Sequence, residues 1–200
     1  MEDNNDLSRW STGDYIYPAI SSNTLQGFAR RAQAQSRFAA IYSEVDAWAA
    51  IAAGMTTTLT MQVDADLDGE NEYVLANDRV FALFERIGGR MVGAWARDPS
   101  DGMIYQVMGN HASAPGVETE LEGNQNLNPD GSIAAFRTSG FKDWVQGGAT
   151  YVNDLYSIAS VANGWQLTSP DGRIIKTITL APSNTAMQVN YQVSTNLNGG

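Results

Sequence analysis

From residue 55 onward the sequence alternates between short apolar runs and turn residues, and this pattern constrains the fold more than any other feature. Within the runs, apolar and polar residues alternate with a period of two, which is typical of strands that place one face in a core. Turn pairs such as Gly88-Gly89, Asn163-Gly164 and Asp171-Gly172 separate the runs. About ten strands are predicted in this way, at residues 57–63, 72–77, 79–85, 91–97, 104–108, 133–138, 151–161, 164–169, 174–180 and 186–193.

Strands at this spacing, without helical segments between them, predict an antiparallel β-sandwich rather than a parallel α/β sheet. A different pattern precedes them. Residues 24–53 lack proline, and their apolar residues recur in steps of mostly three and four, which predicts one long amphipathic helix. These residues are Leu25, Phe28, Ala32, Phe38, Ile41, Tyr42, Val45, Trp48, Ala49 and Ala52. The apolar stripe needs a partner surface, either the body of this protein or a neighbouring molecule.

Three regions follow from these patterns. Residues 1–23 are expected to form an extended arm with aromatic residues at Trp10, Tyr15 and Tyr17. Residues 24–54 are expected to form the helix with its end, and residues 55–200 a β-sandwich clamped by calcium. The N-terminus is acidic and shows no secretory signal, and no apolar run reaches the length of a membrane span.

Charge and cysteine content exclude several classes of protein. The chain has 12 basic and 22 acidic residues, a net charge of −10 and no cysteine. A nucleic-acid binder that follows phosphates needs clusters of Lys and Arg, so that class is disfavoured. Without cysteine there is no disulfide framework, thiolate nucleophile or cysteine-ligated metal site.

The strongest local motif is an acidic loop with carboxylates at alternate positions. Its candidate ligands are Asp64, Asp66, Asp68, Glu70 and Glu72, with Gly69 at position six. Carboxylates at positions one, three and five, followed by glycine, direct hard oxygens toward one point, as Ca²⁺ requires. Glu70 would contribute its carbonyl, and Glu72 a carboxylate directly or through water. Because Leu75 stands where an EF-hand has its bidentate acid, and strands flank the loop, the motif predicts a calcium-binding β-hairpin loop.

A surface turn that binds nothing is the alternative interpretation of this loop. Three alternating aspartates repel one another in the absence of a cation, which favours the metal site. Mg²⁺ fits less well than Ca²⁺, because it prefers few protein ligands and several waters. The expected role is structural, at the junction of the helix and the sheet.

Catalytic candidates are few. His111 is the only histidine, and no serine has a nucleophile elbow around it. A carboxylate pair for glycoside hydrolysis could come from an acidic set whose spacing does not select among its members, namely Glu118, Glu120, Glu122, Asp130 and Asp143. The alternative is that Glu118, Glu120 and Glu122 form a solvated acidic loop.

Aromatic residues offer a further kind of site, since flat rings can stack on sugars. Trp95, Trp144 and Tyr151 are the candidates for such a ligand-binding platform. Trp144 lies in a segment flanked by glycines, which favours a loop position. The alternative for each ring is the core of the sandwich.

Parts of the strand region resemble a known family. Residues 77–92, where a strand runs into the Gly88-Gly89 hairpin, and residues 169–180 and 187–193 are similar to strands of β-supersandwich (galactose-mutarotase-like) domains. Such domains are attached to bacterial and archaeal glycoside hydrolases of the α-amylase and glucanotransferase type. The resemblance covers residues 24–193 and implies an accessory role in a carbohydrate-active lineage. It transfers no catalytic residue, because the family's catalytic carboxylates belong to a preceding barrel that this chain does not contain.

Three functional hypotheses follow. The first is a calcium-stabilised, carbohydrate-associated β-sandwich that binds glucan-type ligands at an extracellular or cell-surface location. The second is a self-assembling extracellular structural protein, an oligomer or filament subunit, held by the N-terminal helix or arm and by calcium. The third is a small glycoside hydrolase that uses a carboxylate pair. The first is preferred, so this chain alone is not expected to be an enzyme.

Overall fold

The computed structural model describes residues 27–67, 69–109, 139–143, 151 and 154–194. Within these residues the protein is mainly β, with one helix followed by nine strands in two antiparallel sheets. The helix is α2 (Gly27–Ala52). The first sheet contains β1 (Leu59–Val63), β2 (Glu72–Ala76), β3 (Val80–Glu85), β4 (Arg90–Arg97) and β5 (Ile104–Met108). The second contains β6 (Ser157–Val161), β7 (Gly164–Thr168), β8 (Ile174–Thr179) and β9 (Gln188–Val193).

Both sheets are simple meanders, in which each strand pairs with the next one along the chain. The predicted strands therefore match the structure closely. One exception is the strand predicted at 151–161: of its described residues, which exclude 152 and 153, Ser157–Val161 form the strand. The strand predicted at 133–138 lies outside the described residues. The turn before β7 requires glycine at residue 164, because a Cβ there would lie 1.9 Å from the carbonyl oxygen of Ile178 on β8.

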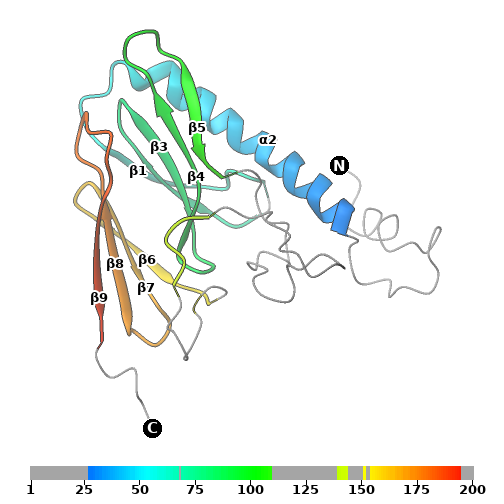
Figure 1. The fold of residues 1–200 in the computed structure, drawn as a ribbon, viewed down its shortest axis with the longest axis vertical. Coiled ribbons are helices and arrows are strands. Elements are labelled where there is room, and N and C mark those ends of the chain that lie inside the picture. The colour runs from blue at the N-terminus through cyan, green and yellow to red at the C-terminus, as the bar shows by residue number, and fades with distance from the viewer. Residues whose placement is uncertain (1–26, 68, 110–138, 144–150, 152–153, 195–200) are drawn as a thin grey trace, which may run out of the picture.

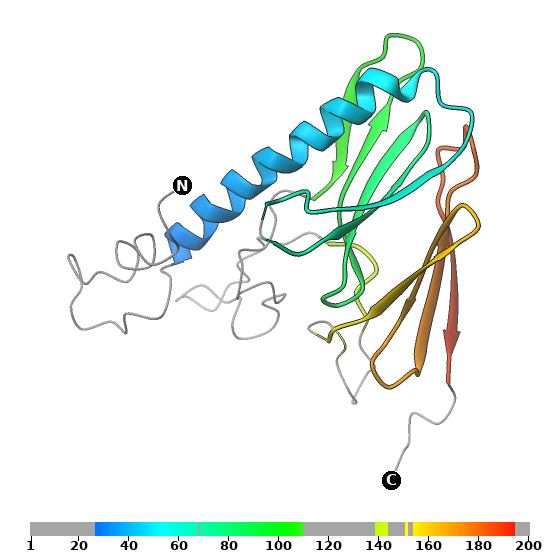
Figure 2. The same ribbon diagram turned by 180° about the vertical axis from the view of Figure 1, so that it is seen from behind.

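The first sheet lies between the helix and the second sheet (Figures 1 and 2). One of its faces forms a core with α2, and this core includes Val74, Phe81 and Trp95. Its other face forms a core with β7 and β8, and the first sheet contributes Leu75, Ala82 and Phe84 to it. Because successive residues of a strand point to opposite faces, β2 is buried along its whole length and β3 at all but its last residue.

The apolar stripe of α2 is used within the molecule. The side chains of α2 are described over about 14 residues, 39–52. Ile41, Val45, Trp48 and Ala52 are buried against the first sheet, at the steps of four and three predicted from the sequence. The indole Nε1 of Trp48 also donates to the carbonyl oxygen of Asn77 at 2.7 Å. A helix before the sheets is thus confirmed, whereas its full length from residue 24 to 53 stays a prediction.

Polar groups connect the two sheets at several places, among them Asn77 and Lys176. Nδ2 of Asn77, which follows β2, donates to the carbonyl oxygens of Ala181 and Asn184 at 2.8 Å each. Lys176 of β8 is fully buried, and its Nζ lies 2.6 Å from a carboxylate oxygen of Asp143. The same ammonium donates to the carbonyl oxygens of Gly89 and Phe141 at 2.5 and 2.8 Å.

We expect Trp48 to be the main anchor of the helix on the sheet. Replacement by alanine (Trp48→Ala) removes a buried ring and its hydrogen bond to Asn77, so the free energy of unfolding is expected to fall by about 3–5 kcal/mol in urea titrations. The control Ile51→Ala changes a helix residue that is 58% exposed, and a change of no more than about 0.5 kcal/mol is expected there. Equal losses in the two variants would contradict this assignment.

Candidate metal centre

The acidic loop connects β1 to β2. These strands pair antiparallel, and Val63 at the end of β1 stands opposite Glu72 at the start of β2. The prediction that strands flank the loop is therefore confirmed. The loop does not lie where the chain passes from the helix into the sheet, because α2 leads into the other end of β1. It does lie against the core that the helix and the sheet share.

Backbone hydrogen bonds draw the loop around its own carboxylates. The N–H of Gly69 donates to a carboxylate oxygen of Asp64 at 3.0 Å, and the N–H of Ala65 donates to Glu72 at 2.8 Å. Gly69 has a φ of +96°, in the left-handed region that favours glycine. Ala65 is 2% exposed and belongs to the same core as the buried stripe of α2, so the loop is attached to the helix and sheet by packing.

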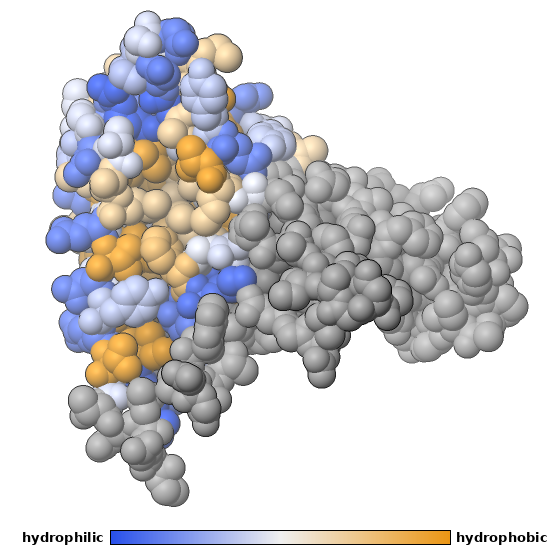
Figure 3. Space-filling model, in the orientation of Figure 1, coloured by the Kyte–Doolittle hydropathy of each residue, from blue (hydrophilic) through white to orange (hydrophobic). Residues whose placement is uncertain are grey.

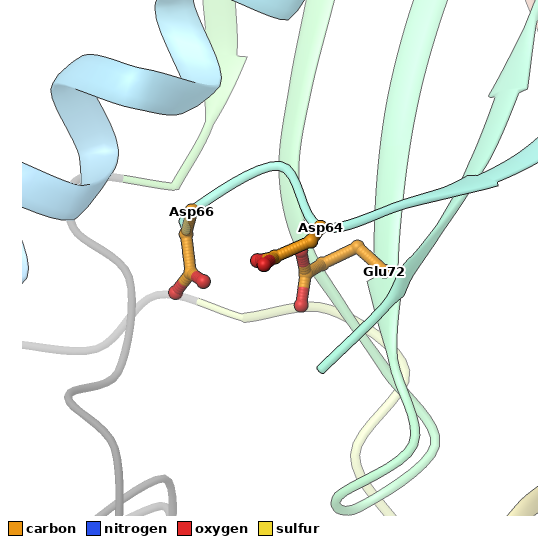
Figure 4. A group of neighbouring side chains, drawn as sticks. All are labelled: Asp64, Asp66 and Glu72. Carbon is orange, nitrogen blue, oxygen red and sulfur yellow. The ribbon is translucent and has the colours of Figure 1, made fainter. Parts of the chain in front are cut away.

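Three carboxylates converge within this loop. Oxygen atoms of Asp64, Asp66 and Glu72 all lie within 4.8 Å of one another (Figure 4). Asp66 and Glu72 are buried, and Asp64 is half-buried. Oxygens that share one Ca²⁺ lie at roughly 2.3–2.6 Å from the ion, and therefore no more than about 5 Å apart. The spacing of the three carboxylates thus allows them to hold a single metal ion.

The electrostatics of the loop disfavour three ionised acids in the absence of a cation. Burial, together with the negative charges of Asp66, Glu85 and Asp64, raises the pKa of Glu72 from its ordinary value of 4.5 to about 8, against the opposing effect of the hydrogen bond from Ala65. Glu85 lies at the end of β3, where its carboxylate is 2.7 Å from Nη2 of Arg90. A bound cation would offset the desolvation and the repulsion together.

The convergence of carboxylates does not test the two remaining predicted ligands, because the prediction for Glu70 concerns its carbonyl oxygen and Asp68 is not described. Glu70 is exposed, and its carboxylate is not among the three that converge. Asp68 lies outside the described residues. The pattern of alternating acids thus predicted all three converging residues, the two aspartates and Glu72.

The described aromatic candidates for a sugar-stacking platform, Trp95 and Tyr151, are buried instead of exposed on a surface. Trp95 is 1% exposed and packs edge-on against Phe81 and Tyr42. Tyr151 is 2% exposed, and its hydroxyl donates to Asp171 at 2.8 Å. Neither ring presents a face on which a sugar could stack, which agrees with the core interpretation. Trp144 lies outside the described residues.

Most of the catalytic candidates also lie outside the described residues, namely His111, Glu118, Glu120, Glu122 and Asp130. Asp143 is described and is 7% exposed. Its carboxylate accepts a hydrogen bond from the hydroxyl of Tyr156 at 2.7 Å and pairs with Lys176. Asp143 therefore acts as the counter-ion of a buried lysine, and this accounts for its position without a catalytic role.

Comparisons with protein-family models, curated proteins and solved structures gave no match. The resemblance to carbohydrate-active domains therefore stays a prediction that rests on the sequence segments named above.

In the part of the chain that the structure describes, no helix has the length and apolar character needed to cross a membrane. Fold and site together define a β protein with two antiparallel sheets, one helix and an acidic group suited to a metal ion.

The raised pKa of Glu72 predicts a pH dependence of stability in the presence of a chelator. Because the folded protein holds this proton more tightly than the unfolded chain, its stabilising contribution is complete below pH 4.5 and is lost as the pH rises through about 8. The free energy of unfolding should fall over this window by on the order of a few kcal/mol, as measured by urea titration at several pH values.

The variant Glu72→Gln should flatten this dependence, since an amide keeps the acceptor for Ala65 and cannot ionise. Glu70→Gln is the matched control, because it removes a charge from an exposed position of the same loop. An unchanged pH profile in Glu72→Gln would show that the pKa of Glu72 is not the cause.

Proposed function

We propose that this chain is a calcium-stabilised β-sandwich module in which Asp64, Asp66 and Glu72 hold the ion. The observation that carries the proposal is the convergence of their carboxylate oxygens within 4.8 Å of one another. The role is structural, since the ion would join the end of β1 to the start of β2 and neutralise a partly buried acidic group. Two antiparallel sheets that share a core support the sandwich architecture.

The chemistry of the ligands favours Ca²⁺ over other ions. All three donors are carboxylate oxygens, which suit hard cations. Ca²⁺ accepts six to eight oxygens in flexible geometry, whereas Mg²⁺ keeps several waters in a strict octahedron. A partly buried group with three carboxylates from one short loop suits Ca²⁺ better than Mg²⁺. Asp68 and the carbonyl of Glu70 would complete the coordination, as the loop pattern predicts.

Ion binding in this loop would affect more than the loop itself. Ala65, between the two aspartates, is buried in the core that α2 shares with the first sheet. Glu72 is the first residue of β2, a strand buried on both faces. Holding these residues together would therefore stabilise the first sheet and the attachment of the helix. Calcium could in this way supply a cross-link to a chain that has no cysteine.

The association with carbohydrate is a separate proposal, supported by the resemblance alone. Trp95 and Tyr151 are too buried to provide a stacking surface. A glucan-binding surface would have to use other residues, Trp144 among them. The accessory role in a glycoside-hydrolase lineage and the extracellular location depend on the same resemblance.

Self-assembly through the helix, the second hypothesis, has lost part of its motivation. Over residues 39–52 the apolar stripe of α2 packs on the first sheet of the same molecule. Self-association would therefore need another surface than this stripe. The N-terminal arm, the other surface named in that hypothesis, lies outside the described residues.

Calcium should raise the melting temperature of the wild-type protein, and a chelator should lower it. A ligand that binds only the folded state adds RT ln(1 + [L]/Kd), about 2.7 kcal/mol at a hundredfold excess over Kd. The variants Asp64→Asn and Asp66→Asn should lose this increment. In the chelator they should melt no lower than the wild type, because each removes a repelling charge.

The control for this experiment is Asp46→Asn, which removes one negative charge from an exposed position of α2. It should keep the full response to calcium, and magnesium should give a smaller response than calcium in every protein that responds. If melting of the wild type is the same with calcium and with chelator, the proposed metal site is excluded.

The carbohydrate proposal predicts that soluble glucans retard the protein in affinity gels and quench its tryptophan fluorescence. Trp144→Ala should weaken both effects. Normal migration with every member of a broad glycan panel would contradict the proposal, and it would leave the calcium site unaffected.

A further inference from the structure

One edge of the second sheet has the properties of a pairing surface. In the strand order β6-β7-β8-β9, the last strand pairs with β8 on one side only. Figures 1 and 2 show β9 at the outside of the molecule, with β8 beside it and no other described element along its outer edge. Every second backbone N–H and C=O of such an edge points away from its sheet and can pair with another strand.

The β9 edge lacks the features that normally prevent pairing between edges. Proteins protect their edges with charges, prolines and bulges. No charged residue occurs anywhere in residues 181–200, although the whole chain carries a net charge of −10. The strand contains no proline, and its pairing with β8 is continuous over six residue pairs without a shift in register.

The other free edges are less suitable. β1 runs directly into the acidic loop of Asp64 and Asp66. β5 is interrupted by a shift of register where β4 passes from Ala94 to Trp95. β6 is uncharged, but its exposed strand residues are small, Ser157, Ala159 and Ser160, and would bury little area.

The two faces of β9 differ in chemistry. Val189, Tyr191 and Val193 stand opposite the inward-facing residues of β8, yet Tyr191 and Val193 are 43% and 50% exposed at the edge. Gln188, Asn190 and Gln192 lie on the opposite face and are exposed. Figure 3 shows apolar surface along β9, interrupted by hydrophilic side chains.

We infer that β9 pairs antiparallel with β9 of a second copy of this chain, about a two-fold axis at Tyr191. In this register Val189 lies opposite Val193 of the second copy, and Tyr191 lies opposite its own counterpart. Asn190 lies opposite Gln192 on the other face. The two sheets become continuous, and each apolar residue of the edge meets an apolar residue.

The charge distribution is what selects a second copy as the partner. Two molecules that each carry a net charge of −10 repel one another, and contact is least unfavourable where neither presents a charge. The β9 edge meets this condition, and the two-fold places identical uncharged segments against each other. The inference is independent of calcium, because β9 belongs to the second sheet and the acidic loop to the first.

Charge variants at exposed positions of β9 test this interface. In Asn190→Lys/Gln192→Lys, the two-fold places the lysine at 190 of each copy opposite the lysine at 192 of the other copy. In Asn190→Glu/Gln192→Glu, it places glutamate opposite glutamate. The control Ser157→Lys/Ala159→Lys introduces the same charges at exposed positions of the β6 edge. Circular dichroism of each variant verifies folding, and sedimentation equilibrium gives the mass of the full chain, with calcium and with chelator.

The wild type and the β6 control should sediment at twice 21.6 kDa. The lysine and the glutamate variant should each dissociate, with a dissociation constant raised roughly tenfold or more. Mixing these two variants should restore the two-chain mass, since opposite charges then face one another. A monomeric wild type at its highest soluble concentration, dissociation of the β6 control alone, or no recovery on mixing would overturn the inference.

Discussion

The burial of the first sheet on both faces is the constraint on which the rest of the molecule depends. Val74 and Leu75 are neighbours on β2, yet one belongs to the core under α2 and the other to the core against the second sheet. Neither the helix nor the second sheet alone could cover both faces. Loss of either layer would expose a sheet face made of large apolar side chains, so the three layers stabilise one another.

Buried polar groups determine how these layers are positioned. Packing of apolar side chains is largely non-directional, whereas the ammonium of Lys176 requires acceptors at defined points. Asp143 and Phe141 supply them from residues 141–143, and Gly89 from the hairpin between β3 and β4. Removing one partner would leave a buried charge without compensation, so the contact favours one arrangement of the second sheet over others.

The acidic loop and the β9 edge illustrate two uses of charge in one acidic chain. In the loop, negative charges are concentrated and partly buried, so desolvation and mutual repulsion disfavour ionisation of Glu72. A cation at this place would offset both effects. At β9, charges are absent over a whole segment, which leaves hydrogen bonding and apolar contact to decide what binds there. Because the two places lie on different sheets, the proposed cation binding and the proposed association do not depend on each other.

The sequence by itself determined the strands, the spacing of the helix stripe and the aspartates of the loop, because these depend on local periodicity and on residues close along the chain. Lys176 alternates with Ile174 and Ile178 along β8, and this spacing indicates that the lysine faces inward. The same pattern gives no information about its partner, Asp143. Only the tertiary structure decided that α2 packs on the outer face of the first sheet, that Trp95 and Tyr151 are core residues, and that Glu85 influences Glu72. These relations join residues far apart in the chain, and periodicity carries no information about which apolar faces will meet.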